Sequence, residues 1–271
     1  MEWERSTADS VRNATKAAAS SFAPLRAFMG RSLRRKVLTV IVLPRIALLN
    51  FVLAESALEL VPKEISGRPA VVSDSKRRGM KASEILLDRS FHHSAMSRLK
   101  DSEKRGRPDL VHVALLSVTG TPLYLDGGVR VFVHTYPGVV LELAEKTRIP
   151  KNYLRFRGLM EKALVERPHE GLVKTYPAGV DELVKRKLGC NLVLGLSIQG
   201  RKSGAEEVAN RVESAKNPCV IVGGFPHGHF SKEVLASVDE LDRIDSRPLE
   251  AHVVASRVVY EIEKTVRGIN D

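Results

Sequence analysis

The sequence predicts an α/β fold built on a largely parallel sheet, and three observations support this. Residues 46–53 form an apolar run without regular alternation, which is typical of a strand buried on both faces. From residue 172 onward, short apolar runs alternate with segments of helical spacing, as in a sheet with crossover helices. One of these runs, Cys219–Val222, leads directly into a glycine-rich loop.

The first half of the chain predicts a mixture of strands and short helices. Residues 66–81 are polar and basic and predict no element, and residues 110–118 are a further apolar run. The alternating residues 129–135 follow a turn at Asp126-Gly-Gly and predict a hairpin with residues 139–143. The other elements expected here are a strand at 46–53, a helical turn at 56–59, a strand at 85–87 and a helix at 94–103.

The second half predicts the alternation of helices and strands more regularly. Residues 153–165 have apolar side chains at helical spacing after Pro150. The elements expected after it are strands at 172–175, 192–196 and 219–222, and helices at 181–187, 205–215 and 251–266.

The chain divides into a short extension and one domain. Residues 1–36 are small, polar and basic, and predict a flexible N-terminal extension or an arm that touches RNA. Residues 45–271 are expected to form a single domain. The most apolar stretch, residues 37–61, is broken by Pro44 and by charged residues, so we expect no membrane span. Cys190 and Cys219 are too few for a disulfide framework or a four-thiolate zinc site and are expected to be buried free thiols.

The composition favours a polyanionic partner. The 271 residues include 43 Lys and Arg against 32 Asp and Glu, a formal net charge of +11. Such a balance favours nucleic acid ahead of a membrane surface. Because aromatic residues are only 5% of the chain, stacking on aromatic side chains is not expected to be the main way of holding bases.

The glycine-rich loop is the sharpest local signal. Gly223-Gly-Phe-Pro-His-Gly228 follows an apolar strand, and ligands in open α/β sheets bind just beyond such strand ends. The spacing matches neither a dinucleotide fingerprint nor a P-loop, so a dinucleotide-dependent oxidoreductase is poorly supported. Alone, the loop is equally compatible with a plain tight turn. Two other strand exits, residues 194–197 and 244–249, strengthen the interpretation as a site for a nucleoside-like small molecule, without a metal-ligand set.

A second candidate functional motif is Arg107-Pro108-Asp109. The proline stiffens the turn, so that the Asp109 carboxylate can hold the Arg107 guanidinium in a fixed direction. The alternative is a helix start with Asp109 as the cap. The neighbouring His92 and His93 diverge in any regular structure and are not expected to share a metal.

A third group is basic. Lys151 and Arg155 would share one face if the helix at 153–165 began early, and with Arg148 they could follow a phosphate backbone. The alternative is a solvated basic face.

Together, five blocks in order resemble the archaeal branch of the SPOUT-class methyltransferases of the nucleolar essential protein family, which methylate pseudouridine in small-subunit ribosomal RNA. The resemblance extends from about Leu48 to Tyr260. The blocks are residues 53–60 (LAESALEL), 88–96 (DRSFHHSAM), 103–109 (EKRGRPD), 147–156 (TRIPKNYLRF) and 223–228 (GGFPHG).

The resemblance implies a SPOUT-like α/β domain with a C-terminal trefoil knot, a hairpin-containing insertion and a mostly parallel sheet. It also implies a cytoplasmic homodimer that needs no metal and no membrane. The implied cofactor is S-adenosyl-L-methionine. Its implied binding residues are Leu194, Leu196, Ser197, Gly223, Gly228, Ile244, Asp245, Ser246, Arg247, Pro248 and Leu249.

The implied reaction is methylation of N1 of a pseudouridine in small-subunit ribosomal RNA, with a role in ribosome biogenesis. By the same resemblance, Arg107 and Asp109 are catalytic, and Arg107, Arg148, Lys151 and Arg155 bind RNA. Lys151 stands where the family usually has arginine, so the charge is kept but the bidentate geometry is lost. The alternatives are a non-enzymatic RNA-binding ribosome-assembly factor and a SPOUT methyltransferase acting on another RNA or on a ribose hydroxyl.

Overall fold

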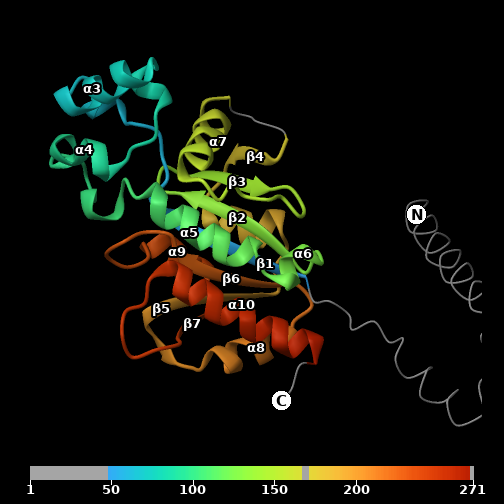
Figure 1. Ribbon diagram of the computed structural model, residues 1–271. Coiled ribbons are helices and arrows are strands. Elements are labelled where there is room, and N and C mark those ends of the chain that lie inside the picture. The colour runs from blue at the N-terminus through green and yellow to red at the C-terminus, as the bar shows by residue number, and fades with distance from the viewer. Residues whose placement is uncertain (1–47, 167–170, 269–271) are drawn as a thin grey trace, which may run out of the picture. The chain divides into compact units, whose positions relative to one another are not determined.

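The computed structural model describes residues 48–166 and 171–268, and a seven-stranded sheet organises them (Figure 1). The strand order is β4-β3-β2-β1-β6-β5-β7. Strand β1 is parallel to β2 and β6, and β5 is parallel to β6 and β7, while β3 is antiparallel to both β2 and β4. The strands are β1 (Leu49–Ser56), β2 (Val129–Thr135), β3 (Val139–Leu143), β4 (Val173–Pro177), β5 (Leu192–Lys202), β6 (Pro218–Gly223) and β7 (Glu240–Arg243). The predicted α/β class, the largely parallel sheet and the hairpin at 129–143 are confirmed.

Strand β1 lies in the centre of the sheet, and every residue of it is buried. Phe51 and Leu53 pack into one hydrophobic core and Val52 and Ala54 into another, because successive side chains point to opposite faces. Both faces are covered, which explains why the run lacks alternation. Of the three polar residues in β1, Asn50 is fully buried and donates hydrogen bonds to Asn217 Oδ1 (2.8 Å) and the Pro218 carbonyl (3.0 Å).

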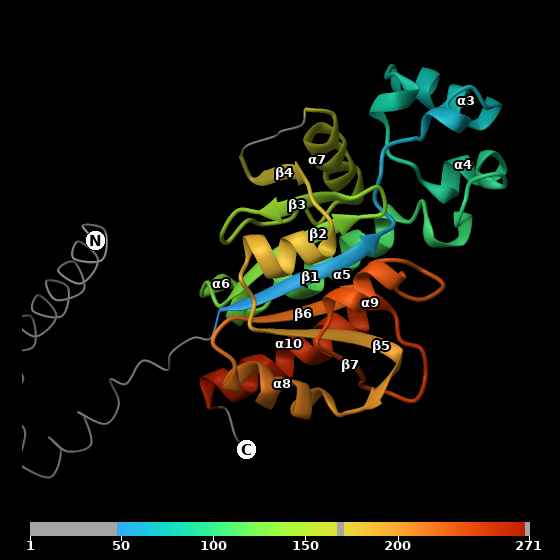
Figure 2. The same ribbon diagram turned by 180° about the vertical axis from the view of Figure 1, so that it is seen from behind.

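Helices cover both faces of the sheet. Helices α5, α8 and α10 pack into one hydrophobic core, and α9 and a π-helical segment, η5, pack into the other. Helices α5 and α10 lie in front of the sheet in Figure 1, and α9 lies in front of it in Figure 2. The helices are α3 (Pro69–Arg78), α4 (Arg89–Met96), α5 (Pro108–Thr119), α6 (Pro122–Leu125), α7 (Tyr153–Val165), η5 (Glu182–Lys187), α8 (Ala205–Ser214), α9 (Lys232–Ser237) and α10 (Ala251–Arg267).

Helices α3 and α4 have a small core of their own, which includes Val71 and Met96. Polar contacts join this part to α7. Arg78 Nη1 donates to Glu161 Oε1 (2.7 Å), and the Tyr153 hydroxyl donates to Asp88 Oδ2 (2.6 Å). These contacts fix α7 against the segment that precedes α5.

Several sequence predictions for the first half are wrong. Residues 56–59 form no helical turn, because the backbone bends at Glu55 (φ +49°) and then hydrogen-bonds to neighbouring loops. The polar segment 66–81 contains helix α3, and the helix expected at 94–103 lies instead at Arg89–Met96. The strand expected at 85–87 is a single bridge between Leu60 and Leu86.

In the remainder, the predicted helices and strands form close to the expected residues. The apolar run at 110–118 belongs to helix α5, and both α9 and β7 were not predicted. Cys190 and Cys219 are buried and free, as expected. The N-terminal extension predicted at 1–36 lies outside the described residues. Within the described part of the chain, no helix is long and apolar enough to cross a bilayer.

Candidate active site

The loop after β6 is held close to the end of β1. The Gly224 amide donates to the Ala54 carbonyl (2.8 Å), and the Gly224 carbonyl accepts from the Ala57 amide (2.8 Å). A Cβ atom at Gly224 would lie 2.2 Å from Ser56 Oγ, so no side chain fits there. Gly228 has a φ of +95°, a backbone conformation that favours glycine. The glycines therefore allow a close backbone approach and a sharp bend in one short loop.

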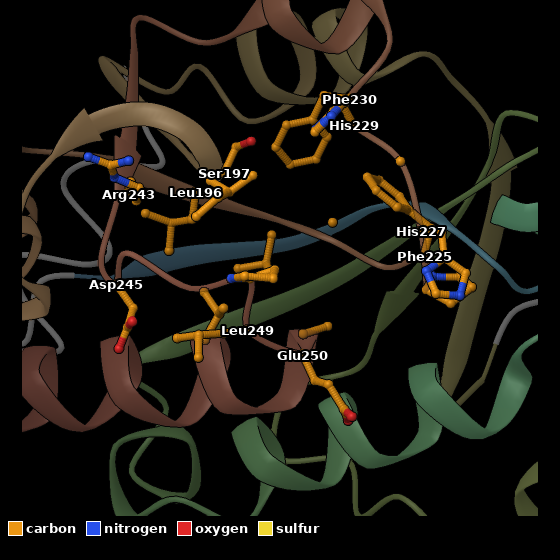
Figure 3. Close-up of a pocket in the computed structure, with 18 of the residues that line it drawn as sticks. Leu196, Ser197, Phe225, His227, His229, Phe230, Arg243, Asp245, Leu249 and Glu250 are labelled. Carbon is orange, nitrogen blue, oxygen red and sulfur yellow. The ribbon is translucent and has the colours of Figure 1, made fainter.

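This loop forms one wall of a cavity of about 550 Å³ (Figure 3). The two other walls are residues 196–198, in the middle of β5, and the loop between β7 and α10. The residues that line the cavity are Leu110, Leu196, Ser197, Ile198, Val222, Gly223, Phe225, Pro226, His227, Gly228, His229, Phe230, Arg243, Ile244, Asp245, Arg247, Pro248, Leu249, Glu250, Ala251 and Val254. Residues from the three segments singled out in the sequence thus line one cavity, although residues 194–197 lie within β5 and not at its exit.

A bulge in β5 shapes the second wall. Leu196 and Arg201 both pair with Asp242 of β7, so residues 197–200 loop out between them. A Cβ atom at Gly200 would lie 2.4 Å from the Asp242 carbonyl carbon, which explains the glycine. Ser197 is the first residue of this bulge and lines the cavity.

Ion pairs order the third wall. Asp245 Oδ1 accepts from the Arg247 amide (3.0 Å) and Arg247 Nε (3.2 Å), and Asp245 Oδ2 accepts from Arg257 Nη1 of α10 (3.2 Å). The hydrogen bonds from Arg247 hold the pKa of Asp245 well below its usual range. Asp245 is therefore a carboxylate at neutral pH and fastens this loop to α10.

Most of the residues predicted to bind a cofactor line this cavity. Two do not: Leu194 is fully buried and pairs with Val220 inside the sheet, and Ser246 is absent from the lining of this cavity among the described residues. The prediction missed the aromatic and charged residues of the same loops, above all Phe225, Arg243 and Glu250. Phe225 lies inside the glycine motif, and this position in the sequence could have identified it as a cavity residue.

Arg107 and Asp109 are brought together at the start of α5. Arg107 Nε and Nη2 each donate a hydrogen bond of 2.8 Å to Asp109, one to each carboxylate oxygen. The side chains are 38% and 48% exposed, so the pair faces solvent. Pro108 is the first helical residue and Arg107 the N-cap, so the motif both starts a helix and braces the guanidinium.

The electrostatics of this pair favour the charged forms. Burial raises the pKa of Asp109, but hydrogen bonding to Arg107, the charge of Arg107 and backbone hydrogen bonds outweigh this and lower it below its usual value. The hydrogen bond to Asp109 raises the pKa of Arg107, and the charge of Glu250 raises it further. Glu250 itself lines the cavity.

The third predicted group lies around the start of α7. Arg148, Lys151 and Arg155 are exposed. Asn152 is the N-cap of α7 and its side chain accepts from the Arg155 amide (3.2 Å), so Lys151 precedes the helix. The early helix start that would have placed Lys151 and Arg155 on one helical face does not occur.

Helix α7 is nevertheless fixed beside α5. The His112 ring of α5 stacks on Phe156 of α7 with ring centroids 4.3 Å apart, and His112 Nε2 lies 2.7 Å from the Pro150 carbonyl. The Tyr153 ring at the start of α7 lies 6.0 Å from the His112 ring, centroid to centroid, so the α7 start lies beside the helix that Arg107 caps. Burial raises the pKa of Tyr153, and the hydrogen bond to Asp88 raises it further. The structure therefore brings the Arg107–Asp109 pair and the basic residues around the start of α7 to one region.

The predicted histidine pair diverges. His92 is fully buried with Nε2 3.4 Å from Asp74, whereas His93 is exposed. In residues 48–166 and 171–268, no group of three or more His, Cys, Asp or Glu side chains could hold a metal ion.

Comparison with known proteins identifies the family. A profile described as EMG1/NEP1 methyltransferase matches residues 51–263. The chain is 40% identical over 220 residues to the ribosomal RNA small subunit methyltransferase Nep1 of Staphylothermus marinus, covering 79% of this chain and 95% of that protein. It is 37% identical over 222 residues to the same-named protein of Thermococcus onnurineus, covering 81% and 100%.

A solved structure agrees with these sequence matches. The crystal structure of Archaeoglobus fulgidus Nep1 bound to S-adenosylhomocysteine superposes with a TM-score of 0.71 at 36% identity, covering 81% of this chain and 98% of that one. Because the family profile, the relatives and the fold agree over most of its length, the chain belongs to the EMG1/NEP1 methyltransferase family.

Proposed function

We propose that this protein uses S-adenosyl-L-methionine to methylate N1 of a pseudouridine in small-subunit ribosomal RNA and so takes part in ribosome biogenesis. The observation that carries the proposal is that the glycine-lined cavity and the braced Arg107 lie at neighbouring segments: Leu110 of α5 lines the cavity, and Ala57 is hydrogen-bonded to both Gly224 and Arg107. Family membership supports the reaction class, and the names of the relatives support the RNA.

The cavity suits an adenosyl cofactor. Its volume of about 550 Å³ lies within the range of small-molecule sites, roughly 300–1,000 Å³. Apolar side chains such as Leu196, Leu249 and Phe225 can cover a base, while the glycine loop offers backbone polar groups. The similar Nep1 structure holds S-adenosylhomocysteine, which supports the assignment. The cofactor, when bound, supplies a methyl group on a positively charged sulfur.

The proposed cofactor residues are those of the sequence prediction that line the cavity. They are Leu196, Ser197, Gly223, Gly228, Ile244, Asp245, Arg247, Pro248 and Leu249. Leu194 and Ser246 are left out, since neither is among the lining residues of this cavity in the described chain.

Arg107 would act on the target base. The N1 nitrogen of pseudouridine is imide-like and protonated at neutral pH. It bonds to the methyl carbon as the methyl–sulfur bond breaks, and it loses its proton to water, so negative charge develops on the ring oxygens. A guanidinium held beside those oxygens stabilises that charge. The lowered pKa of Asp109 makes it a weak proton acceptor, so we assign it the role of orienting Arg107. Positioning of the two substrates can contribute ~7–11 kcal/mol.

Arg148, Lys151 and Arg155 would bind the RNA backbone. All three are exposed and lie at the α7 start, which is fixed beside α5. Sequence-specific RNA recognition favours single-stranded loops, whose bases can be turned out of the stack. We therefore propose a hairpin loop as the substrate.

The knot and the homodimer also belong to this proposal. Strand β7 lies at the sheet edge beyond β5, and the chain returns from there through residues 244–250 to α10, which packs in the core with α5 and α8. This return path is compatible with a trefoil knot. Helices α5 and α10 each expose an apolar side chain, Val113 and Tyr260, which supports a second copy of the chain as the partner. The cytoplasmic location expected from the resemblance stays a prediction.

The function is tested with two matched RNA hairpins. One carries pseudouridine at a loop position and the other carries uridine there, and each is incubated with the protein and S-adenosyl-L-methionine. Mass spectrometry of the nucleosides should find N1-methylpseudouridine from the first hairpin alone. A methylated ribose or a methylated uridine would place the activity on another acceptor. Failure of calorimetry to detect S-adenosylhomocysteine binding would favour a ribosome-assembly factor without enzymatic activity.

A further inference from the structure

The sequence block at residues 53–60 has no role in the proposed reaction, yet it joins the two halves of the site. Ala57 donates its amide to the Gly224 carbonyl (2.8 Å) and accepts from the Arg107 amide at its own carbonyl (3.1 Å). The glycine loop and the Arg107 segment are thus hydrogen-bonded to the same residue.

Glu55, two residues earlier, makes side-chain contacts to both segments. It is buried, and its φ of +49° is uncommon for a residue that is not glycine. Its Oε1 accepts from the amide of Ser231, the N-cap of α9, three residues beyond the glycine loop (3.1 Å). Its Oε2 pairs with Lys104 Nζ (3.1 Å). Such backbone conformations persist only where surrounding contacts hold them, and they cluster at functional sites.

Lys104 contacts the glycine loop from the opposite side. Its Nζ lies 4.6 Å from the centroid of the Phe225 ring and donates to the His229 carbonyl. A Cβ atom at Gly228 would lie 3.0 Å from Lys104 Cε, so the lysine stem packs against the bend of the loop. Phe225, Gly228 and His229 all line the cavity proposed for the cofactor.

The Lys104 segment is itself anchored to the same block. Arg105 Nε and Nη2 donate to the two carboxylate oxygens of Glu59, each at 2.7 Å, and both side chains are buried. The two segments are therefore joined at three points. Lys104 binds Glu55, Arg105 binds Glu59, and the Arg107 amide binds the Ala57 carbonyl. A shift of one segment cannot occur without straining contacts to the other.

We propose that Lys104 and Glu55 are positioning residues that hold the glycine loop and couple cofactor binding to RNA binding through the Arg107 segment. This inference rests on the proposed function for the identity of the two ligands. Neither residue needs to touch the reacting atoms. Because coupling between two binding sites is reciprocal, S-adenosylhomocysteine should tighten RNA binding by the same factor as RNA tightens S-adenosylhomocysteine binding.

The first experiment measures the loop without any ligand. Hydrogen exchange of the amides at 224–231 is compared in the full-length protein and in Lys104→Met, which keeps most of the aliphatic stem but loses the charge. Faster exchange confined to this loop is expected in the variant. Lys100→Met is the matched control, since Lys100 is exposed and borders a neighbouring cavity of about 390 Å³ that Glu55 and Lys104 also line.

The second experiment measures both affinities. By calorimetry, Lys104→Met should weaken S-adenosylhomocysteine binding by about tenfold, the size expected for a lost charge-assisted hydrogen bond. In steady-state kinetics the cofactor KM should rise by a similar factor while kcat at saturation changes by less than about threefold. Lys104→Arg keeps the charge and should restore most of the affinity. Glu55→Gln added to Lys104→Met should weaken binding little further, because the two residues act as a pair.

The third measurement tests the coupling itself. In the wild-type protein, S-adenosylhomocysteine should tighten binding of the pseudouridine hairpin by about fivefold or more, and this factor should approach one in Lys104→Met. Equal coupling factors in both proteins, or loop exchange that the variant leaves unchanged, would overturn the inference while the proposed function stands. If the wild-type protein fails to bind S-adenosylhomocysteine, the proposed function fails, and the ligand-free exchange experiment still decides whether the pair holds the loop.

Discussion

The guanidinium of Arg107 is held by both oxygens of the Asp109 carboxylate, two residues further along the chain, through parallel hydrogen bonds of 2.8 Å. A bidentate pair fixes the plane of the guanidinium as well as its distance. The remaining donors of Arg107 are left to face solvent beside the cavity rim. This geometry makes Arg107 the residue whose replacement should affect the reaction most.

Arg107→Ala should lower the rate of methyl transfer by about 10²–10³-fold, because a preorganised donor beside developing charge is lost. Affinity for S-adenosylhomocysteine should stay within about threefold, since Arg107 does not line the cavity. Single-turnover kinetics on the pseudouridine hairpin and calorimetry measure the two effects separately.

The control is Arg98→Ala, which removes an exposed arginine and preserves the Arg107 pair. It should transfer methyl groups at the wild-type rate. Near-normal transfer by Arg107→Ala would exclude the role assigned to this residue.

Gly224→Ala should destabilise the protein, because its Cβ atom would meet Ser56 Oγ at 2.2 Å and Ser56 Cα at 2.8 Å. Overpacking of this kind costs about 1–3 kcal/mol. Urea unfolding followed by circular dichroism measures the loss. Gly158→Ala is the matched control, since Gly158 lies inside α7 with nothing within 4 Å of its Cβ position. There alanine should stabilise by up to about 1 kcal/mol, and an equal loss in both variants would contradict the argument.

Arg155→Ala should weaken RNA binding and reduce its salt dependence. If Arg155 neutralises one phosphate, the slope of log K against log salt should become shallower by about 0.7–0.9. Filter binding of the hairpin across a salt series gives this slope. Arg186→Ala is the control, because Arg186 is exposed in η5, an element that does not carry the proposed RNA surface. A slope unchanged by Arg155→Ala would remove that residue from the RNA surface.

His134 should make stability depend on pH. Burial lowers the pKa of His134 below 6.5, and the nearby Glu55 carboxylate offsets this only in part. The unfolded chain then binds the proton more readily than the folded one. The stabilisation is therefore complete above pH 6.5 and is lost as the pH falls toward the lowered value.

His134→Gln should flatten this dependence by at most about 1.4 kcal/mol per pH unit, the slope for one proton. Denaturant unfolding at a series of pH values from neutral to acidic measures it. His93→Gln, at an exposed position, should leave the dependence as in the wild type. A wild-type slope retained in His134→Gln would show that other groups cause it.

The parts of the fold that the sequence predicts are those set by local pattern. Strand β1 and the hairpin of β2 and β3 follow from buried or alternating apolar runs, which are read over a few residues. Helix α3 could not be predicted in this way, because its small core is completed by distant residues of α4 and its sequence is mostly polar. The helical turn expected at 56–59 does not form because the backbone bends at Glu55, and that bend involves contacts to Lys104 and Ser231 from other parts of the chain.

In the candidate site, too, the features set by neighbouring residues could be predicted, and those set by distant contacts could not. Asp109 bracing Arg107 was predictable, since the residues are two apart and a proline stiffens the turn between them. Leu194 is buried inside the sheet, away from the cavity, because β5 pairs with both β6 and β7. This pairing could not be read from the local sequence. The inclusion of Arg243 and Glu250 depends on the path from β7 to α10, and no motif marks them.

The long separation between Asn50 and its hydrogen-bond partner at Pro218, 168 residues apart, bears on how the chain is made. During translation β1 emerges long before β6, the strand that occupies one of its edges. Until then a wholly buried strand of the finished molecule exposes an unpaired apolar edge, which is a hazard for association between nascent chains. Such distant pairings also slow folding. Because the loop after β6 is hydrogen-bonded to the end of β1, the candidate site can form only after both strands have been made.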